Sequence, residues 1–321
     1  MALPSNTLAT YEAIGNHEDL SNIVYRISPT DAPFTSGIER EKASSTKHEW
    51  QTQELAPAST SNAQLEGDDS TTKVVTARIR RFNYCQISTK TVRVSGTQQA
   101  MNTAGVPNEL ANQALLAGLE LKTDIESQTV GSNQAQNAGA DATARVSASV
   151  MSWIKTNTSK ASAGTPGVDP AAADGTGTRT DGTQIAFTEQ RMRTVLSAIW
   201  TQGGYANVVM VNGFNKQQFS TFTGRSSPIE QAAAKKITAS VTAYESDFGM
   251  LKVVPNRFMR TRDVLILEMD KWSLGYLNGR SMVNLPLAVT GDSQRRMMLS
   301  EYVLVSRNEK ASGGVFDNTT S

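Results

Sequence analysis

Two strand-like runs flank a polar tip near the start of the chain, and this pattern strongly constrains the fold. Residues 46–53 and 72–95 are rich in Thr, Val, Ile, Tyr and Phe, side chains that suit a pleated, half-buried surface. Between them, residues 56–63 have the small and polar composition of a mobile tip. We expect the two runs to form one long ribbon. An isolated hairpin is at best marginally stable in water, so this ribbon needs a partner surface.

Charge divides the ribbon into two halves. Every charged side chain between residues 49 and 71 is acidic: Glu49, Glu54, Glu66, Asp68 and Asp69. Every charged side chain between residues 72 and 95 is basic: Lys73, Arg78, Arg80, Arg81, Lys90 and Arg93. Complementary halves suit pairing between strands or between subunits, and they protect an exposed edge from wrong pairing.

Six of these charges are candidate subunit-interface residues, namely Glu66, Asp68, Asp69, Arg78, Arg80 and Arg81. A basic strand could instead bind nucleic acid, with Phe82 and Tyr84 as stacking platforms, but the acidic flank argues against this. Trp50 is a seventh candidate. We expect its ring to fill a groove on a neighbouring subunit, because buried aromatic side chains dominate interface energetics.

Two helices and several strands are predicted after the ribbon. The first helix begins near Pro107 and ends near Thr129, before Gly131. Its apolar stripe comprises Leu110, Ala114, Ala117, Leu121 and Ile125, widened by Leu115 and Leu119. A second helix has Thr188 as its N-cap and ends at Gly203 and Gly204.

Short apolar runs at residues 208–211, 250–254 and 264–267 are consistent with buried strands, so this part forms a compact mixed layer. The run 299–306 predicts a strand beside the first helix. Residues 131–187 are polar apart from an apolar island at 150–154, and they predict a long surface loop. An outer decoration or receptor contact is the alternative for this loop.

Composition excludes several classes of protein. Lys and Arg total 31 against 30 Asp and Glu, so no concentrated basic footprint for tight nucleic-acid binding is expected. The single cysteine, Cys85, excludes an internal disulfide framework and fits a reducing cytoplasm. No apolar run reaches the length of a membrane span, and the N-terminus lacks the pattern of a secretory signal.

An enzyme would need catalytic groups that the sequence does not supply. The two histidines, His17 and His48, lie too far apart in the chain to imply a joint site. Gly291-Asp-Ser is not a nucleophile elbow, and no phosphate-binding glycine motif occurs. Asp174-Gly-Thr-Gly177 is similar to the aspartic-protease triplet but has no second copy. We therefore expect no enzymatic activity, no cofactor and no metal.

Several motifs along the whole chain occur in the order that is typical of one protein family. They are Asp31-Ala-Pro-Phe-Thr-Ser-Gly-Ile38, Thr46-Lys-His-Glu-Trp-Gln51, Tyr244-Glu-Ser-Asp-Phe-Gly249, Met250-Leu-Lys-Val-Val-Pro-Asn-Arg-Phe258, Gly291-Asp-Ser-Gln-Arg-Arg-Met297 and Glu301-Tyr-Val-Leu-Val305. Together they resemble the major capsid proteins of tailed double-stranded DNA bacteriophages of the Hong Kong 97 type. The specificity lies in having all of them at the family's spacing.

The resemblance implies an α+β fold with five parts. They are an N-terminal arm (1–45), the ribbon as an extended loop (46–95), a peripheral domain with a long spine helix and a flexible loop (96–184), an axial domain (185–280) and a return to the peripheral domain (281–321). In this family the extended loop lies across the adjacent subunit. The apolar residues Leu20, Ile23, Val24 and Ile27 have helical spacing, so the arm docks either on a neighbour or on its own subunit.

The function implied is that of a major capsid protein, which assembles into hexamers and pentamers of an icosahedral shell around double-stranded DNA. The expected partners are further copies of the chain, a separately encoded scaffold, a portal and decoration proteins, without sequence-specific DNA binding and without a membrane. The implied location is the virion, with assembly in the host cytoplasm. The alternatives are an encapsulin-like nanocompartment shell that encloses a cargo enzyme, and a hydrolase or lyase of the virion tail, which the missing site residues disfavour.

Overall fold

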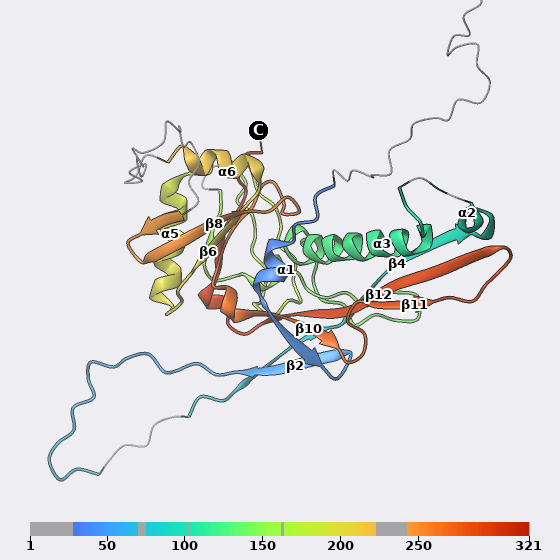
Figure 1. Cartoon of the computed structure of the whole chain (residues 1–321). Coiled ribbons are helices and arrows are strands. Elements are labelled where there is room, and N and C mark those ends of the chain that lie inside the picture. Colours follow the sequence, from blue (N-terminus) through green and yellow to red (C-terminus); the bar gives the residue numbers. More distant parts are fainter. Residues whose placement is uncertain are drawn as a thin grey trace, which may run out of the picture.

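The computed structural model describes residues 28–69, 75–101, 103, 105–161, 164–222 and 243–320. Two sheet-based bodies lie side by side, and a ribbon extends from their junction (Figure 1). One body is elongated and carries the long helix. The other carries two shorter helices at the opposite end of the molecule. The expectation for Leu20, Ile23, Val24 and Ile27 falls outside the described residues.

The elongated body is built on a five-stranded sheet. Its path runs β1 (Glu39–Ala43), β10 (Trp272–Leu277), β12 (Ser293–Ser306) and β11 (Val283–Pro286), and β4 (Gln86–Ser95) also pairs with β12. The predicted strand 299–306 is thus the second half of a longer strand. Only the β1–β10 pair is parallel.

Helix α3 (Glu109–Glu126) packs along one face of this sheet, against β4 and β12. The Asn108 side chain caps the helix by accepting a 3.0 Å hydrogen bond from the Ala111 amide. The five stripe residues from Leu110 to Ile125 are buried, which confirms the predicted face. Leu115 is 53% exposed and lies at the rim of that face, because the sheet covers a narrower stripe than we expected. A π-helical turn, η1 (Ser127–Gly131), continues the helix, and the short helix α2 (Gly96–Ala100) follows β4.

The second body is a six-stranded sheet. Its order is β5 (Thr158–Ser159), β13 (Gly313–Val315), β9 (Val264–Leu267), β6 (Val208–Val211), β8 (Gly249–Pro255) and β7 (Ala243–Ser246). The predicted strands at 208–211, 250–254 and 264–267 are confirmed. All four residues of β9 are buried because its two faces serve different cores. Val264 and Ile266 face the core under α5 (Glu189–Thr201), whereas Leu265 and Leu267 join the core shared with α3.

Helices α5 and α6 (Gly213–Ser220) cover the outer face of this sheet (Figure 1). Helix α5 follows the prediction closely: the Thr188 hydroxyl accepts from the Arg191 amide, and Met192, Val195, Leu196 and Ile199 are buried. The 3-10 turns η2 (Met269–Lys271) and η3 (Glu309–Ala311) and the short helix α4 (Val150–Trp153) complete the regular elements of the described residues.

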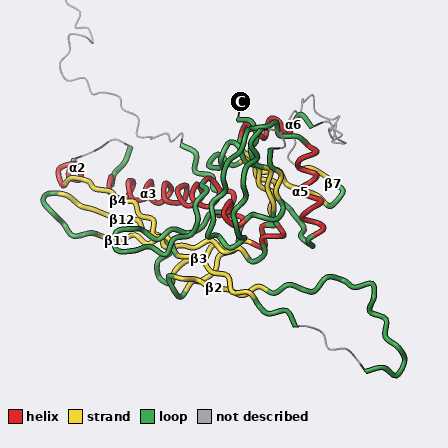
Figure 2. The backbone as a smooth tube through the Cα atoms, turned by 180° about the vertical axis from the view of Figure 1, so that it is seen from behind, coloured by secondary structure: helices red, strands yellow, loops and turns green. Residues whose placement is uncertain are grey.

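The ribbon itself is shorter than predicted. Strands β2 (Lys47–Thr52) and β3 (Ile79–Tyr84) pair antiparallel, with Trp50 opposite Arg81. The predicted second strand is interrupted at Cys85, and its continuation β4 leaves the ribbon to pair with β12. Residues 58–69 extend from the ribbon away from both bodies (Figure 2). Of the expected strand 72–95, the described residues that pair within the ribbon are therefore Ile79–Tyr84.

Part of the predicted arm is integrated into the body. Helix α1 (Pro33–Gly37) buries Phe34, whose ring meets that of Trp272 edge-on at 6.3 Å. The buried Glu126 carboxylate accepts 2.8 Å hydrogen bonds from the amides of Phe34 and Thr35. These bonds satisfy amides at the start of α1 that have no partner within the helix, which explains why this segment is held in place.

Residues 131–187 contain little regular structure, as expected, but they are not a simple surface loop. The apolar island of α4 lies in the main core, where Trp153 is buried. The buried Arg179 forms ion pairs with Asp169 and Asp317, and its guanidinium lies 3.7 Å from the centre of the Phe316 ring. This segment also supplies β5, which pairs with β13. Strand β13 places residues 313–315 in the six-stranded sheet, beside β9.

Candidate assembly interface

Trp50 anchors the base of the ribbon to its own subunit. Its indole Nε1 donates a 2.9 Å hydrogen bond to the Ser306 carbonyl, and its ring lies 5.5 Å from that of Trp153. The side chain is half-buried against the main core. The ring and the N–H donor of Trp50 are thus engaged within the chain, and its expected contact with a neighbouring subunit stays a prediction.

The next residue pair along the ribbon base is His48 and Glu41, whose Nε2 and Oε1 atoms lie 3.0 Å apart. This hydrogen bond lowers the pKa of the Glu41 carboxyl. Arg307 contacts the same carboxylate at 3.3 Å and forms a 2.7 Å ion pair with Glu39. His48 thus joins β2 to β1 of the five-stranded sheet and has a structural partner.

The three candidate arginines differ in their surroundings. Arg80 pairs with Glu49 across the ribbon at 3.6 Å, and Arg78 donates a 3.3 Å hydrogen bond to the Gln51 side chain. Both are exposed. Arg81 is half-buried and has no ion pair within the described part of the chain. Pairing between strands, one of the two explanations of the charge pattern, accounts for Arg80 but not for Arg81.

The three candidate acidic residues lie together at the ribbon tip. The Asp68 amide donates a 3.2 Å hydrogen bond to the Leu65 carbonyl, and Gly67 between them has φ of 84°. This closes a turn that requires a left-handed residue at its third position, which glycine adopts without strain. Glu66, Asp68 and Asp69 are exposed, and none of them meets a cation among the residues that the structure describes. Leu55 and Leu65 are 94% and 79% exposed.

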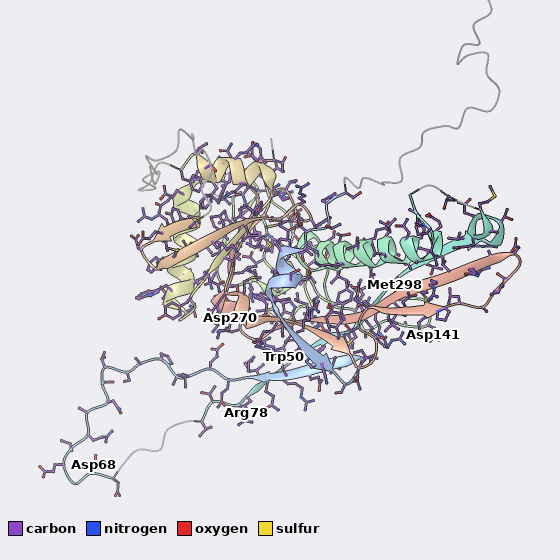
Figure 3. All side chains as sticks on the ribbon, in the orientation of Figure 1. Trp50, Asp68, Arg78, Asp141, Asp270 and Met298 are labelled. Atoms are coloured by element: carbon purple, nitrogen blue, oxygen red, sulfur yellow. The ribbon has the colours of Figure 1, made fainter. Side chains whose placement is uncertain are left out.

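The structure therefore separates the acidic tip from the arginines within one chain. Figure 3 shows Asp68 at the far end of the ribbon, well away from Arg78 and Trp50 at its base. Any pairing of Glu66, Asp68 or Asp69 with Arg78, Arg80 or Arg81 would have to join two copies.

A cavity of about 820 Å³ lies at the base of the ribbon. Its wall combines the end of β2 and the segment after it, Arg81 of β3, Trp153 of α4, the end of α5 and residues 306–310. Two cations in this wall are already paired, Arg307 with Glu39 and Lys310 with Glu54 at 2.8 Å. Trp153 and Ser306 each carry a buried polar side-chain atom without a hydrogen-bond partner. Sequence reasoning missed this cavity because its wall, which also includes Ala173, comes from six distant segments.

A second, smaller groove of about 390 Å³ lies between α3 and strands β11 and β12. It is lined by Leu110, Leu115 and Met298 together with Arg296. The exposure of Leu115 is explained by its position at this groove.

The remaining candidates for chemistry have structural explanations. Burial raises the pKa of the Cys85 thiol to about 11, so the thiol is a poor nucleophile at neutral pH. The Asp174 carboxylate accepts hydrogen bonds from the amide and hydroxyl of Thr176 and so closes its own turn. Within the described ranges, no cluster of three or more His, Cys, Asp or Glu side chains could hold a metal ion. No helix in the described part is both long and apolar enough to span a membrane.

Comparison with known proteins decides the family. A family model described as SU10 major capsid protein matches residues 4–319. The chain belongs to the SU10 major capsid protein family. A curated relative, the major capsid protein of Escherichia phage Phieco32, is 26% identical over an alignment of 351 residues, gaps included, that covers 98% of each chain.

Solved structures share the fold at low sequence identity. A capsid of a native GTA particle has a TM-score of 0.64 at 9% identity, covering 98% of this chain and all of that one. A Gordonia phage Cozz chain has a TM-score of 0.62 at 9% identity, covering 98% and 96%. A structure of phage G major capsid and decoration proteins has a TM-score of 0.56 at 11% identity, covering 99% and 100%.

The fold is therefore the α+β Hong Kong 97 type expected from the motifs. The protein is a major capsid protein of a phage, a structural component of the virion shell that assembles with further copies of itself. The nanocompartment alternative is not favoured by these relatives.

Proposed function

We propose that the chain assembles into hexamers and pentamers through contacts that join unlike surfaces of neighbouring copies. The observation that supports this most directly is the ribbon tip, which presents the exposed Leu65 and three carboxylates that meet no cation among the described residues. A contact between two unlike surfaces of the same chain closes into a ring when the rotation between copies is a simple fraction of a turn. Both ring sizes can then form from one chain with small changes in that rotation.

The five predicted parts supply the contacts in this proposal. The extended loop (46–95) reaches across a neighbour, the axial domain (185–280) surrounds the capsomer axis, and the peripheral domain (96–184 with 281–321) meets adjacent capsomers. The arm (1–45) contributes through its first residues, since residues 33–43 pack in the body. Trp50, Glu66, Asp68, Asp69, Arg78, Arg80 and Arg81 remain the proposed interface residues, with Trp50 acting by fixing the ribbon base.

Catalysis, a cofactor and a metal play no part in this proposal. The shell encloses double-stranded DNA without reading its sequence, because the chain is nearly neutral and so attracts the phosphate backbone only weakly. A separately encoded scaffold, a portal and decoration proteins are the proposed partners, and assembly takes place in the host cytoplasm.

Expression of the chain alone tests the need for a scaffold. We expect capsomers or irregular shells from the isolated chain, and shells of uniform size only when the scaffold gene is expressed with it. Electron microscopy distinguishes the two outcomes. Uniform shells from the chain alone would contradict the scaffold proposal, whereas soluble monomers under both conditions would contradict the assembly proposal.

A further inference from the structure

We propose that the cavity at the ribbon base is a socket for the acidic turn at the ribbon tip of a neighbouring copy. The turn comprises residues 65–69, and the socket is the 820 Å³ cavity lined by Arg81, Trp153 and Ser306. This inference rests on the proposed assembly and specifies the partner of one of its surfaces.

The tip is preorganised for insertion. The hydrogen bond from the Asp68 amide to the Leu65 carbonyl closes the turn before any contact is made. A second hydrogen bond, 2.9 Å from the Asp69 amide to the Asp68 carboxylate, further fixes its shape. A segment that is already ordered loses less conformational entropy on binding. It presents three carboxylates and one leucine on a narrow turn.

The charges of the socket wall are mixed, but its two carboxylates already have partners. Glu54 pairs with Lys310, and Glu309 accepts a hydrogen bond from the Thr156 hydroxyl. Arg81 is the cation in its wall without an ion pair among the described residues, and Arg78 and Arg80 continue the positive charge along the exposed strand. The Ser306 hydroxyl and the Trp153 indole N–H are buried without partners, and a buried donor without an acceptor is costly. The cavity volume is within the range of about 300–1,000 Å³ for pockets that bury a drug-sized ligand.

The occupant must come from a second copy. The tip lies at the far end of the ribbon whose base forms the socket wall, so a chain cannot insert its own turn (Figure 3). Socket and tip are unlike surfaces of the same chain, which gives a head-to-tail contact that closes into a ring. The acidic half of one ribbon therefore meets the basic half of the ribbon of another copy.

Cross-linking in assembled shells tests this placement. Ala63→Cys beside the turn and Ala173→Cys in the socket wall would be combined in one chain and treated with a short bis-maleimide. The matched control combines Ala63→Cys with Ala111→Cys, which lies in the groove beside α3. The parent chain, with only the buried Cys85, gives the background.

We expect covalent dimers and higher multimers from the 63/173 variant in shells, none from the same variant as dilute monomer, and none from the 63/111 variant. Shells that cross-link through 63/111, or through neither pair, would overturn the socket and leave the proposed assembly intact. A parent chain that forms no shells with its scaffold would overturn the proposed assembly and the socket with it.

If the paired cysteines block assembly, a charge exchange tests the same contact. Arg81→Glu should lower the yield of shells, and adding Asp68→Lys in the same chain should restore it. The control is Arg296→Glu in the α3 groove, which Asp68→Lys should not rescue. Equal rescue of both variants, or of neither, would contradict the inference.

Discussion

The indole of Trp50 and the carbonyl of Ser306 are joined by a 2.9 Å hydrogen bond across 256 residues of sequence. This bond fixes β2 of the ribbon to the end of β12, the central strand of the five-stranded sheet. The Trp153 ring, tilted by 39° relative to that of Trp50, packs against the same joint from α4. The direction in which the ribbon leaves the body is therefore set by packing within the subunit.

Replacement of Trp50 should destabilise the unassembled subunit. For Trp50→Ala we expect a loss of about 2–4 kcal/mol in the free energy of unfolding, below the upper range for a fully buried aromatic side chain because the ring is only half-buried. Trp50→Phe keeps a ring but removes the N–H donor, and should cost about 1 kcal/mol. Denaturant unfolding of the monomer measures both. An unchanged monomer with defective assembly would return Trp50 to a contact between subunits.

Glu126 should be essential for docking α1 on the body. Its carboxylate accepts from the Phe34 and Thr35 amides and from the Asn256 side chain at 2.6 Å, all in a buried setting. In Glu126→Gln an amide group replaces one acceptor oxygen and faces these donors, so we expect a loss of about 1–3 kcal/mol. The control is Glu120→Gln on the exposed side of the same helix, which should cost about 0.5 kcal/mol or less. Equal effects would contradict the role assigned to Glu126.

Asp263 should make stability depend on pH. Burial raises the pKa of its carboxyl to about 7 from an ordinary 3.8, although Arg260 lies 3.2 Å away. The folded state then binds a proton that the unfolded state has released. Stability should therefore fall as pH rises from about 4 to 7, by at most a few kcal/mol. Asp263→Asn should remove this component, so that the stability of the variant relative to the parent increases over the same range. A difference between the two that is constant with pH would contradict the buried neutral carboxyl.

Reversal of the three ribbon arginines should block assembly and spare the fold. A single exposed pair contributes only about 0–1 kcal/mol, but Arg78, Arg80 and Arg81 changed together to Glu would repeat the clash at every contact. Raised salt should weaken the defect, because exposed charges are screened beyond roughly 8–10 Å at physiological ionic strength. Circular dichroism checks the fold, and sedimentation measures assembly.

The complementary change restores the charge pattern. Lysine at positions 66, 68 and 69 in the triple-reversed chain should recover shells. Failure to recover at any salt concentration would mean that the arginines face another surface or the packaged genome.

Local patterns in the sequence predicted the local structure well. The cap at Thr188 and the buried stripe of α3 depend on residues only a few positions apart. The family motifs predicted the fold. The features that the sequence did not reveal depend on pairings between distant segments. Strand β4 pairs with β12, β13 pairs with β9, and the Trp50 indole forms a hydrogen bond with the Ser306 carbonyl. The cavity wall is likewise formed by segments that lie far apart in the sequence. The polar composition of residues 131–187 did not predict their burial. Small polar side chains pack there through hydrogen bonds, as Ser149 does with the backbone of Gln134.

An electron cryo-microscopy reconstruction of the assembled shell tests the central claim most directly. We expect rings of six and five subunits in which the ribbon of each copy crosses its neighbour, with density for Glu66, Asp68 and Asp69 beside Arg81 of that neighbour. A shell in which each ribbon folds back on its own subunit, or in which the contacts between copies do not involve the ribbon, would contradict it.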